Sequence, residues 1–287
     1  MGTFLYFRTY WGKGSATGLS GRNILATDKM QLVRTCIKSL ELDTLKIHTC
    51  ACVDHSTPEY TAFLESTFDE VFHTAEGCDI TDLKGNWPVF GGIGNLARVH
   101  RFIAEKHHQP DDVVLIVEDD YLFIDQGLRR WISACQQLPG FVTPFDHPDR
   151  YLRNDDLYHR RPEIAIVDDR HWRTAESTSS VVGGRYQYFA KTAFIQKLPR
   201  LYVRSLWPSR LIGKELASID RTFYRRAYLW LRVKLYSPMP GLATHLSRFI
   251  PPPSNKYLKK GVTLPTSQLS PGVDWEKRFA TLAGGAS

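Results

Sequence analysis

The chain has 287 residues, of which 43% are hydrophobic and 23% are charged, so it contains enough apolar side chains to bury a core. The sequence has no run of about 18 apolar residues, which excludes a membrane-spanning helix. The first residues also lack the basic-then-apolar order of a secretory signal, and we therefore expect a cytoplasmic protein.

The net charge of +7 is unevenly distributed along the chain. Residues 1–149 contain 13 Lys and Arg against 20 Asp and Glu, whereas residues 150–260 contain 22 against 8. The basic half is either a solvated face or a surface that meets an anionic partner. That partner would be a diphosphate, a phospholipid surface contacted peripherally, a lipid-linked acceptor or a nucleic acid.

Apolar runs that predict strands alternate with helical periodicity in the first half of the chain. Strands are expected at 4–7, 45–53, 70–73 and 113–117, and helices at 27–42, at 59–68 and around 93–104. The run from Val113 to Val117 is uninterrupted and largely β-branched, as expected for a strand covered on both faces. This alternation predicts an α/β fold with a mixed, mainly parallel sheet and helices on both faces.

The second half is less regular. Residues 163–167 and 187–190 are predicted to be strands, and residues 220–230 a helix. Three prolines at 251–253 then end the pattern, and residues 251–287 are expected to form a Pro-rich C-terminal tail. We therefore expect one domain over residues 1–250.

Five cysteines are present, an odd number without the spacing of a zinc site. We expect them to be reduced core residues of a cytosolic protein. They are Cys36, Cys50, Cys52, Cys78 and Cys135.

Three consecutive acids, Glu118, Asp119 and Asp120, directly follow the apolar strand at 113–117. Carboxylates are costly to bury without partners, and ligands of open α/β sheets bind at the carboxyl ends of the strands. Clustered carboxylates at that edge suit Mg²⁺ or Mn²⁺, which would bridge to phosphate oxygens. The alternative is a solvated loop that is acidic by chance.

This acidic segment resembles the DxD motif of the GT-A glycosyltransferases, particularly those like family 2, with Glu in place of the first Asp. The resemblance implies that Asp120 coordinates the metal, and that Glu118 and Asp119 contact the ribose or metal-bound water. It spans about residues 3–250. The resemblance implies a Rossmann-like GT-A domain in which residues 1–125 form the nucleotide-sugar-binding half and residues 126–250 the acceptor-binding half.

Other candidate donor-binding residues match the family in order along the chain. Arg8 and Thr9 leave the first strand, and Asp54 ends the second, where the family holds the nucleoside. Taken alone, Asp54 is equally explained as a turn residue before Ser-Thr-Pro. Asn95 and Arg98 lie in a Gly-rich turn, from which they would approach the diphosphate or the base.

Further matches lie in the second half. Gly183 and Gly184 resemble the Gly-Gly segment that shapes the cleft between donor and acceptor. Asp220 corresponds to the acid of inverting members that takes the acceptor proton, although an acid favoured at a helix start explains it as well. His245 corresponds to a C-terminal histidine ligand of the metal, against the plainer interpretation of a structural histidine.

The resemblance implies a metal-dependent glycosyltransferase. It would move a sugar from a nucleoside-diphosphate donor, with UDP as the expected carrier, to an acceptor hydroxyl. Mn²⁺ or Mg²⁺ is the expected cofactor, and a histidine ligand favours Mn²⁺. The acceptor would be a glycan, a lipid-linked glycan or a modified base in DNA.

Two other functions are compatible with parts of the sequence. The pattern Gly92-x-Gly94-x-x-Ala97 matches the fingerprint of NAD-dependent oxidoreductases, but Pro88 disfavours the strand that should precede it. The Arg and aromatic residues of the basic half would suit a non-catalytic nucleic-acid-binding module. That function would leave the carboxylates unused.

Overall fold

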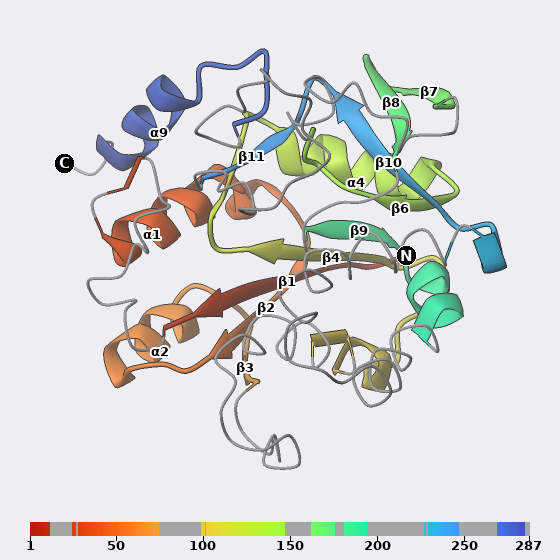
Figure 1. The fold of residues 1–287 in the computed structure, drawn as a ribbon. Coiled ribbons are helices and arrows are strands. Elements are labelled where there is room, and N and C mark those ends of the chain that lie inside the picture. Colours follow the sequence, from red (N-terminus) through yellow and green to blue (C-terminus); the bar gives the residue numbers. More distant parts are fainter. Residues whose placement is uncertain are drawn as a thin grey trace, which may run out of the picture.

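The computed structural model describes residues 1–11, 25–26, 28–74, 99–100, 102–146, 162–175, 181–193, 227, 229–246 and 269–284. Its centre is a nine-stranded sheet with the order β3-β2-β1-β4-β9-β6-β10-β8-β7. Four of these strands form a parallel group: β1 (Thr3–Tyr10), β2 (His48–Asp54), β3 (Glu70–His73) and β4 (Val113–Glu118). Figure 1 shows β1, β2 and β4 side by side through the middle of the molecule.

The other strands extend this sheet beyond β4. They are β9 (Val182–Arg185), β6 (Gly140–Val142), β10 (Lys234–Met239), β8 (Arg170–Ala175) and β7 (Ile164–Val167). Within this nine-stranded sheet, β9 and β8 run opposite to the other strands. A separate two-stranded sheet pairs β5 (Tyr121–Phe123) with β11 (Ala243–His245) in antiparallel fashion.

Helices cover both faces of the central sheet. Helices α1 (Lys29–Ser39), α2 (Pro58–Glu65) and α4 (Gly127–Gln137) pack on the face that carries Leu115 and Val117. Helical residues 102–105 and 186–193 pack on the other face, which carries Val114 and Ile116. This alternation explains why the predicted strand at 113–117 is apolar throughout. The predicted α/β class, with a mixed and mainly parallel sheet between helices, is therefore confirmed.

The predicted elements of the first half are confirmed, with shifted ends, except that residues 93–98 of the helix expected around 93–104 lie outside the described residues. The short 3-10 helix η1 (Leu42–Thr44) follows α1, and β2 begins at His48 rather than at residue 45. Helix α4 was not predicted. In the second half, residues 164–167 form the expected strand, whereas most of the helix expected at 220–230 lies outside the described residues.

The prediction of a strand at 187–190 is wrong, because residues 186–193 are helical. Aromatic residues at 186, 188 and 189 gave this segment a strand-like composition. In the helix, Phe189 is buried against the sheet, and the Thr192 hydroxyl donates to the carbonyl of Tyr188 one turn earlier.

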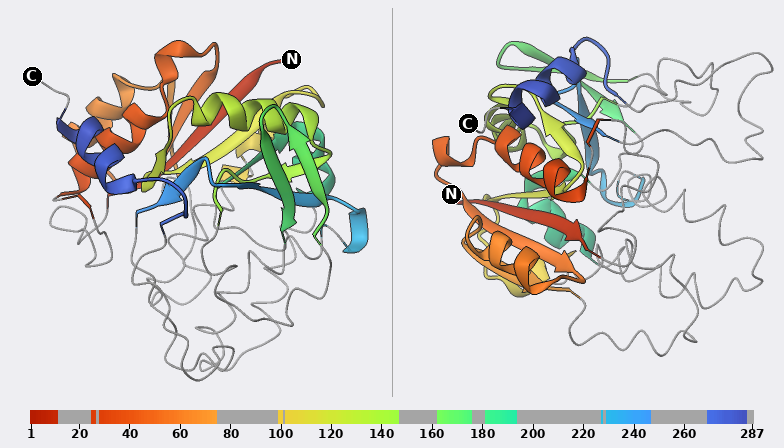
Figure 2. Two further views of the ribbon diagram at one scale, coloured as in Figure 1. Left: turned by 90° about the horizontal axis from the view of Figure 1, so that it is seen from above. Right: turned by 90° about the vertical axis from the view of Figure 1, so that its left-hand side faces the viewer.

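Helix α9 (Trp275–Gly284) lies within the predicted tail and packs beside α1 (Figures 1 and 2). Trp275 and Phe279 are buried against Leu32, Cys36 and Leu246.

In the described part of the chain, no helix combines the length and the apolar character needed to cross a bilayer. Four of the five cysteines are free and buried, as expected, and Cys78 lies outside the described residues.

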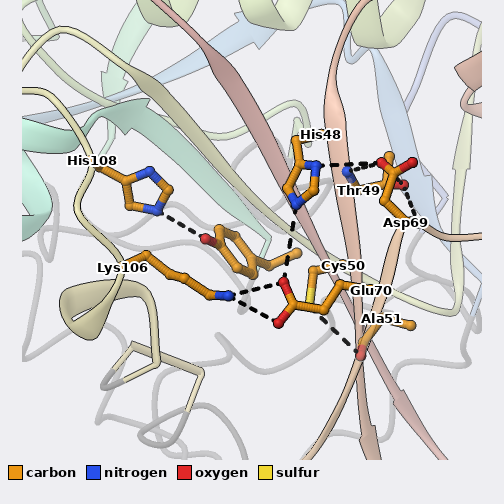
Figure 3. A network of polar contacts seen from close by, with 9 residues as sticks. His48, Thr49, Cys50, Ala51, Asp69, Glu70, Lys106 and His108 are labelled. Atoms are coloured by element: carbon orange, nitrogen blue, oxygen red, sulfur yellow. Dashed lines mark hydrogen bonds and ion pairs between the residues drawn. The ribbon is translucent and has the colours of Figure 1, made fainter.

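Polar contacts fix the amino edge of the sheet (Figure 3). Lys106 Nζ lies 2.9 Å from both carboxylate oxygens of Glu70, which joins the segment after residue 105 to the start of β3. Asp69 accepts hydrogen bonds from the backbone and the hydroxyl of Thr49 at 2.7 and 2.8 Å. These contacts hold β2 and β3 in register at the edge opposite the acidic segment.

Asp112 fixes the start of β1 and β4 in a similar way. Its Oδ1 accepts from the Gly2 backbone N–H at 2.6 Å, and its Oδ2 accepts from that of Gln109 at 2.8 Å. Burial opposes ionisation of this carboxyl, but the two N–H donors outweigh it and hold the pKa of Asp112 below its ordinary value.

We expect Asp112→Ala to lower the free energy of unfolding by about 1–3 kcal/mol, because two backbone N–H groups lose the acceptor of a partly buried hydrogen bond. Since the folded pKa is depressed, the stabilisation by Asp112 is present above the unfolded pKa and is lost as the pH falls through the folded pKa. Urea unfolding at several pH values measures both effects. Asp111→Ala is the control, since Asp111 is 68% exposed; an equal loss in both variants would contradict the prediction.

Candidate functional site

The carboxyl ends of β1, β2 and β4 meet at one edge of the sheet. Arg8 in β1 is level with Glu118 in β4, and Tyr10 is level with Asp54 in β2. Because β1 lies between the other two strands, Asp54 and the acidic segment are separated by roughly 9–10 Å, two strand spacings. The candidate site is built at this edge.

Glu118 is paired with Arg8. The guanidinium Nη1 of Arg8 donates to Glu118 Oε1 at 2.9 Å, and the Arg8 side chain is only 6% exposed. Burial raises the pKa of Glu118 above its ordinary value, although Arg8 opposes this shift. Arg8 therefore holds the first carboxylate of the segment, and little of its own surface is exposed to a ligand.

Asp119 accepts several donors on one oxygen. The Thr9 hydroxyl, the Tyr10 backbone N–H at 3.3 Å and Lys29 Nζ at 2.6 Å all contact Asp119 Oδ2. The hydroxyl of Tyr60, from α2, lies 2.5 Å from that of Thr9. Burial alone would lower the pKa of Lys29, but Asp119 outweighs it and raises this pKa above its ordinary value, so Lys29 remains protonated.

Asp120 meets His245, which comes 125 residues later in the chain. Pairing of β5 with β11 places His245 opposite Tyr121, and the two rings stack with centroids 4.9 Å apart. His245 Nε2 lies 2.7 Å from Asp120 Oδ2. Burial would raise the pKa of Asp120, but the histidine and its hydrogen bond hold it below the ordinary value.

Asp54 is 8% exposed, and its Oδ1 lies 2.8 Å from His55 Nδ1. The Tyr10 ring meets the His55 ring edge-on, with centroids 5.6 Å apart. These two side chains are 45% and 63% exposed, respectively. A carboxylate beside exposed rings can accept hydroxyl hydrogen bonds and offers an aromatic surface to a planar group.

The structure thus brings together six of the residues predicted for this edge, and His245 as well. They are Arg8, Thr9, Asp54, Glu118, Asp119 and Asp120.

Gly183 and Gly184 are placed differently, because β9 runs antiparallel to β4 with these glycines opposite Leu115 and Val114. A Cβ on Gly183 would lie 2.5 Å from a Leu115 methyl group and 3.0 Å from Cys135 Sγ, so core packing beside the sheet favours glycine there. Asn95, Arg98 and Asp220 lie outside the described residues, as does the Gly92-x-Gly94-x-x-Ala97 pattern.

Lys29 and Tyr60 belong to the site but were not predicted from the sequence. Lys29 could have been noticed in the sequence, because the first turn of α1 has no acidic residue and begins with a cation. Acids, not cations, are favoured at that end of a helix. A lysine there indicates a nearby carboxylate. Tyr60 follows ordinary helix periodicity and gave no signal.

The three acids are balanced by three basic groups from distant parts of the sequence. Searched for metal-binding groups, the described residues contain no cluster of three or more His, Cys, Asp or Glu side chains able to hold an ion. The close pair of Asp120 and His245 offers one oxygen and one nitrogen donor. The arrangement can bind a polar ligand that presents hydroxyl groups to Asp54 and negative charge to Lys29.

Comparison with known proteins gives distant likenesses only. No family model and no curated protein matches the chain. A solved structure of 4-diphosphocytidyl-2C-methyl-D-erythritol synthase is 10% identical with a TM-score of 0.37, and the match covers 77% of this chain and 97% of that one. The galactosyltransferase LgtC, in complex with donor and acceptor sugar analogues, is 10% identical with a TM-score of 0.42 and coverages of 99% and 96%. Similarity at this level does not establish an activity, and the fold class rests on the sheet itself.

We expect Arg8→Met to lower the free energy of unfolding by about 2 kcal/mol or more, because a largely buried carboxylate loses its partner. Adding Glu118→Gln should restore part of that loss, since the uncompensated charge is removed. Chemical unfolding of both single variants and the double variant measures the coupling. Additive losses would contradict the pairing.

Proposed function

We propose that the chain is a glycosyltransferase that uses a nucleoside-diphosphate sugar and transfers the sugar to an acceptor hydroxyl. The observation that carries the proposal is the meeting of His245 with Asp120 at 2.7 Å, beside Asp119 and at the same sheet edge as Asp54. An acidic turn at the end of a central strand, an acid at the end of the second strand and a late histidine were expected together from the GT-A resemblance. The contact of His245 with Asp120, at the sheet edge where Asp54 also lies, supports the proposal.

Asp54 would hold the nucleoside in this proposal. Its carboxylate can accept hydrogen bonds from ribose hydroxyls, and the exposed Tyr10 and His55 rings beside it offer a surface for a base. Uracil is the proposed base. Asp119, with one oxygen already in contact with several donors, would orient the turn more than it would bind the ligand.

Asp120 and His245 would hold the divalent cation. Oδ2 and Nε2 are close enough for one ion to contact both, and a carboxylate with an imidazole suits Mn²⁺ better than Mg²⁺. Donor phosphate oxygens and water would supply the other ligands, as is usual for ions bound by few protein groups. When bound, the ion would stabilise the negative charge that develops on the leaving diphosphate.

Asp220 is the proposed base that takes the proton from the acceptor hydroxyl, which would make the reaction inverting. The acceptor is proposed to be a glycan or a lipid-linked glycan, consistent with the basic character of residues 150–260. Neither a DNA acceptor nor a membrane contact has support from the described residues.

The first test is a thermal-shift panel of UDP, GDP, CDP, ADP and their common sugar conjugates, each with Mn²⁺ and with EDTA. A saturating ligand at a hundred times its Kd adds about 2.7 kcal/mol, which predicts an increase in Tm of roughly 5–10 °C. Stabilisation by one nucleotide, dependent on metal, would support the donor site and identify the base. No stabilisation by any nucleotide would overturn the proposal.

The proposed metal pair makes a second prediction. Asp120→Ala should reduce sugar transfer at least about a hundredfold, because stabilisation of the leaving group is lost while the fold is retained. His245→Ala should raise the Mn²⁺ concentration needed for half-maximal activity. Transfer assays over a Mn²⁺ titration measure both effects.

Exposed residues of the same types provide matched controls, namely Asp43→Ala and His171→Ala. Full activity of the Asp120 variant, or an unchanged Mn²⁺ titration for the His245 variant, would remove that residue from the site.

A further inference from the structure

Lys29 is a cation held inside the acidic cluster. It is the first residue of α1, directly after the N-cap Asp28, and its side chain is only 13% exposed. Its Nζ lies 2.6 Å from Asp119 Oδ2, and Asp120 is near enough to favour its charged form. Lysine is rarely buried to this degree unless it is paired, so its placement needs an explanation.

Asp119 does not need Lys29 as a hydrogen-bond donor. Asp119 Oδ2 already accepts from the Thr9 hydroxyl and from the Tyr10 backbone N–H. Both donors come from β1, which is fixed in the sheet on both sides. Lys29 therefore adds positive charge to a carboxylate that other groups already orient.

The donor capacity of Lys29 exceeds what the described residues use. An ammonium has three N–H donors, and among the described side chains the contact of Lys29 Nζ is with Asp119. The other two acids have their own basic partners, Arg8 for Glu118 and His245 for Asp120. Lys29 thus combines a position inside the acidic cluster with hydrogen-bonding capacity for a ligand.

We propose that Lys29 binds the diphosphate of the nucleotide donor and stabilises it as the leaving group; this rests on the proposed function. A compact ammonium with several donors is a common phosphate ligand. Before the donor binds, Lys29 offsets the charge of Asp119. When the nucleotide sugar is bound, the N–H groups of Lys29 are shared between the Asp119 carboxylate and the phosphate oxygens.

The reaction step balances without a proton from Lys29. The bond between the sugar C1 and the diphosphate oxygen breaks, and its electron pair leaves with the nucleoside diphosphate. A bond forms between C1 and the acceptor oxygen, whose proton passes to the base. Lys29 remains protonated throughout and contributes electrostatically as negative charge grows on the diphosphate.

The test compares the binding of a nucleoside diphosphate with that of the same nucleoside lacking phosphate, by calorimetry at a fixed Mn²⁺ concentration. UDP and uridine are the first pair, and the GDP, CDP and ADP pairs follow. Lys29→Met should weaken diphosphate binding about tenfold or more, the size expected for loss of a hydrogen bond to a charged group. Its nucleoside binding should be unchanged, because Asp54 and the rings beside it are intact.

Two further variants separate a phosphate contact from a purely structural role. Lys38→Met removes a lysine from the last turn of the same helix and should leave both affinities unchanged. Lys29→Arg keeps the charge, should retain most of the diphosphate affinity, and serves if the methionine variant does not fold.

An equal loss of diphosphate and nucleoside binding in Lys29→Met, or no loss of either, would overturn the role of Lys29 alone. An equal loss of diphosphate and nucleoside affinity in the charge-retaining Lys29→Arg would also overturn the role of Lys29. If no diphosphate binds the unaltered chain, the proposed function fails and this inference fails with it.

Discussion

Three consecutive carboxylates lie at the end of the buried strand β4 and directly after it, and the arrangement of this sheet edge depends on how their charge is balanced. Each acid has a basic partner from a different element: Arg8 in β1, Lys29 in α1 and His245 in β11. A partly buried carboxylate without a partner is costly, so these three contacts constrain the positions of the elements relative to β4. The candidate site is therefore also a point where distant parts of the chain are held together.

The fold class was predictable because local signals and burial agree. The apolar run of β4 is covered on both faces, and in the first half apolar runs mark the strands while a 3.6-residue period marks the helices. The strand predicted at 187–190 failed because aromatic residues suit a helix face as well as a strand. Helix α4 was missed, although its residues include the fully buried Trp131.

The residues of the candidate site could be named from the sequence where they lie next to one another in the chain. The turn from Glu118 to Asp120 marks itself by following an apolar strand, and His245 was found by its order in a family resemblance. The partnership of Lys29 with Asp119 spans 90 positions, and no local pattern encodes which acid a lysine will meet. The glycines at 183 and 184 have a second explanation that the sequence does not reveal, since a side chain at 183 would meet Leu115 and one at 184 would meet the Gly140 carbonyl.

The position of His245 has a consequence for how the protein is made. The acidic turn leaves the ribosome 125 residues before the histidine that pairs with Asp120. The helix that buries Leu246 follows later still, at residues 275–284. During synthesis the parallel half of the sheet can therefore form first, with Arg8 and Lys29 as its internal counterions. Asp120 can meet its histidine partner only after residue 245 has emerged, so this contact forms later in translation than the contacts of Arg8 and Lys29.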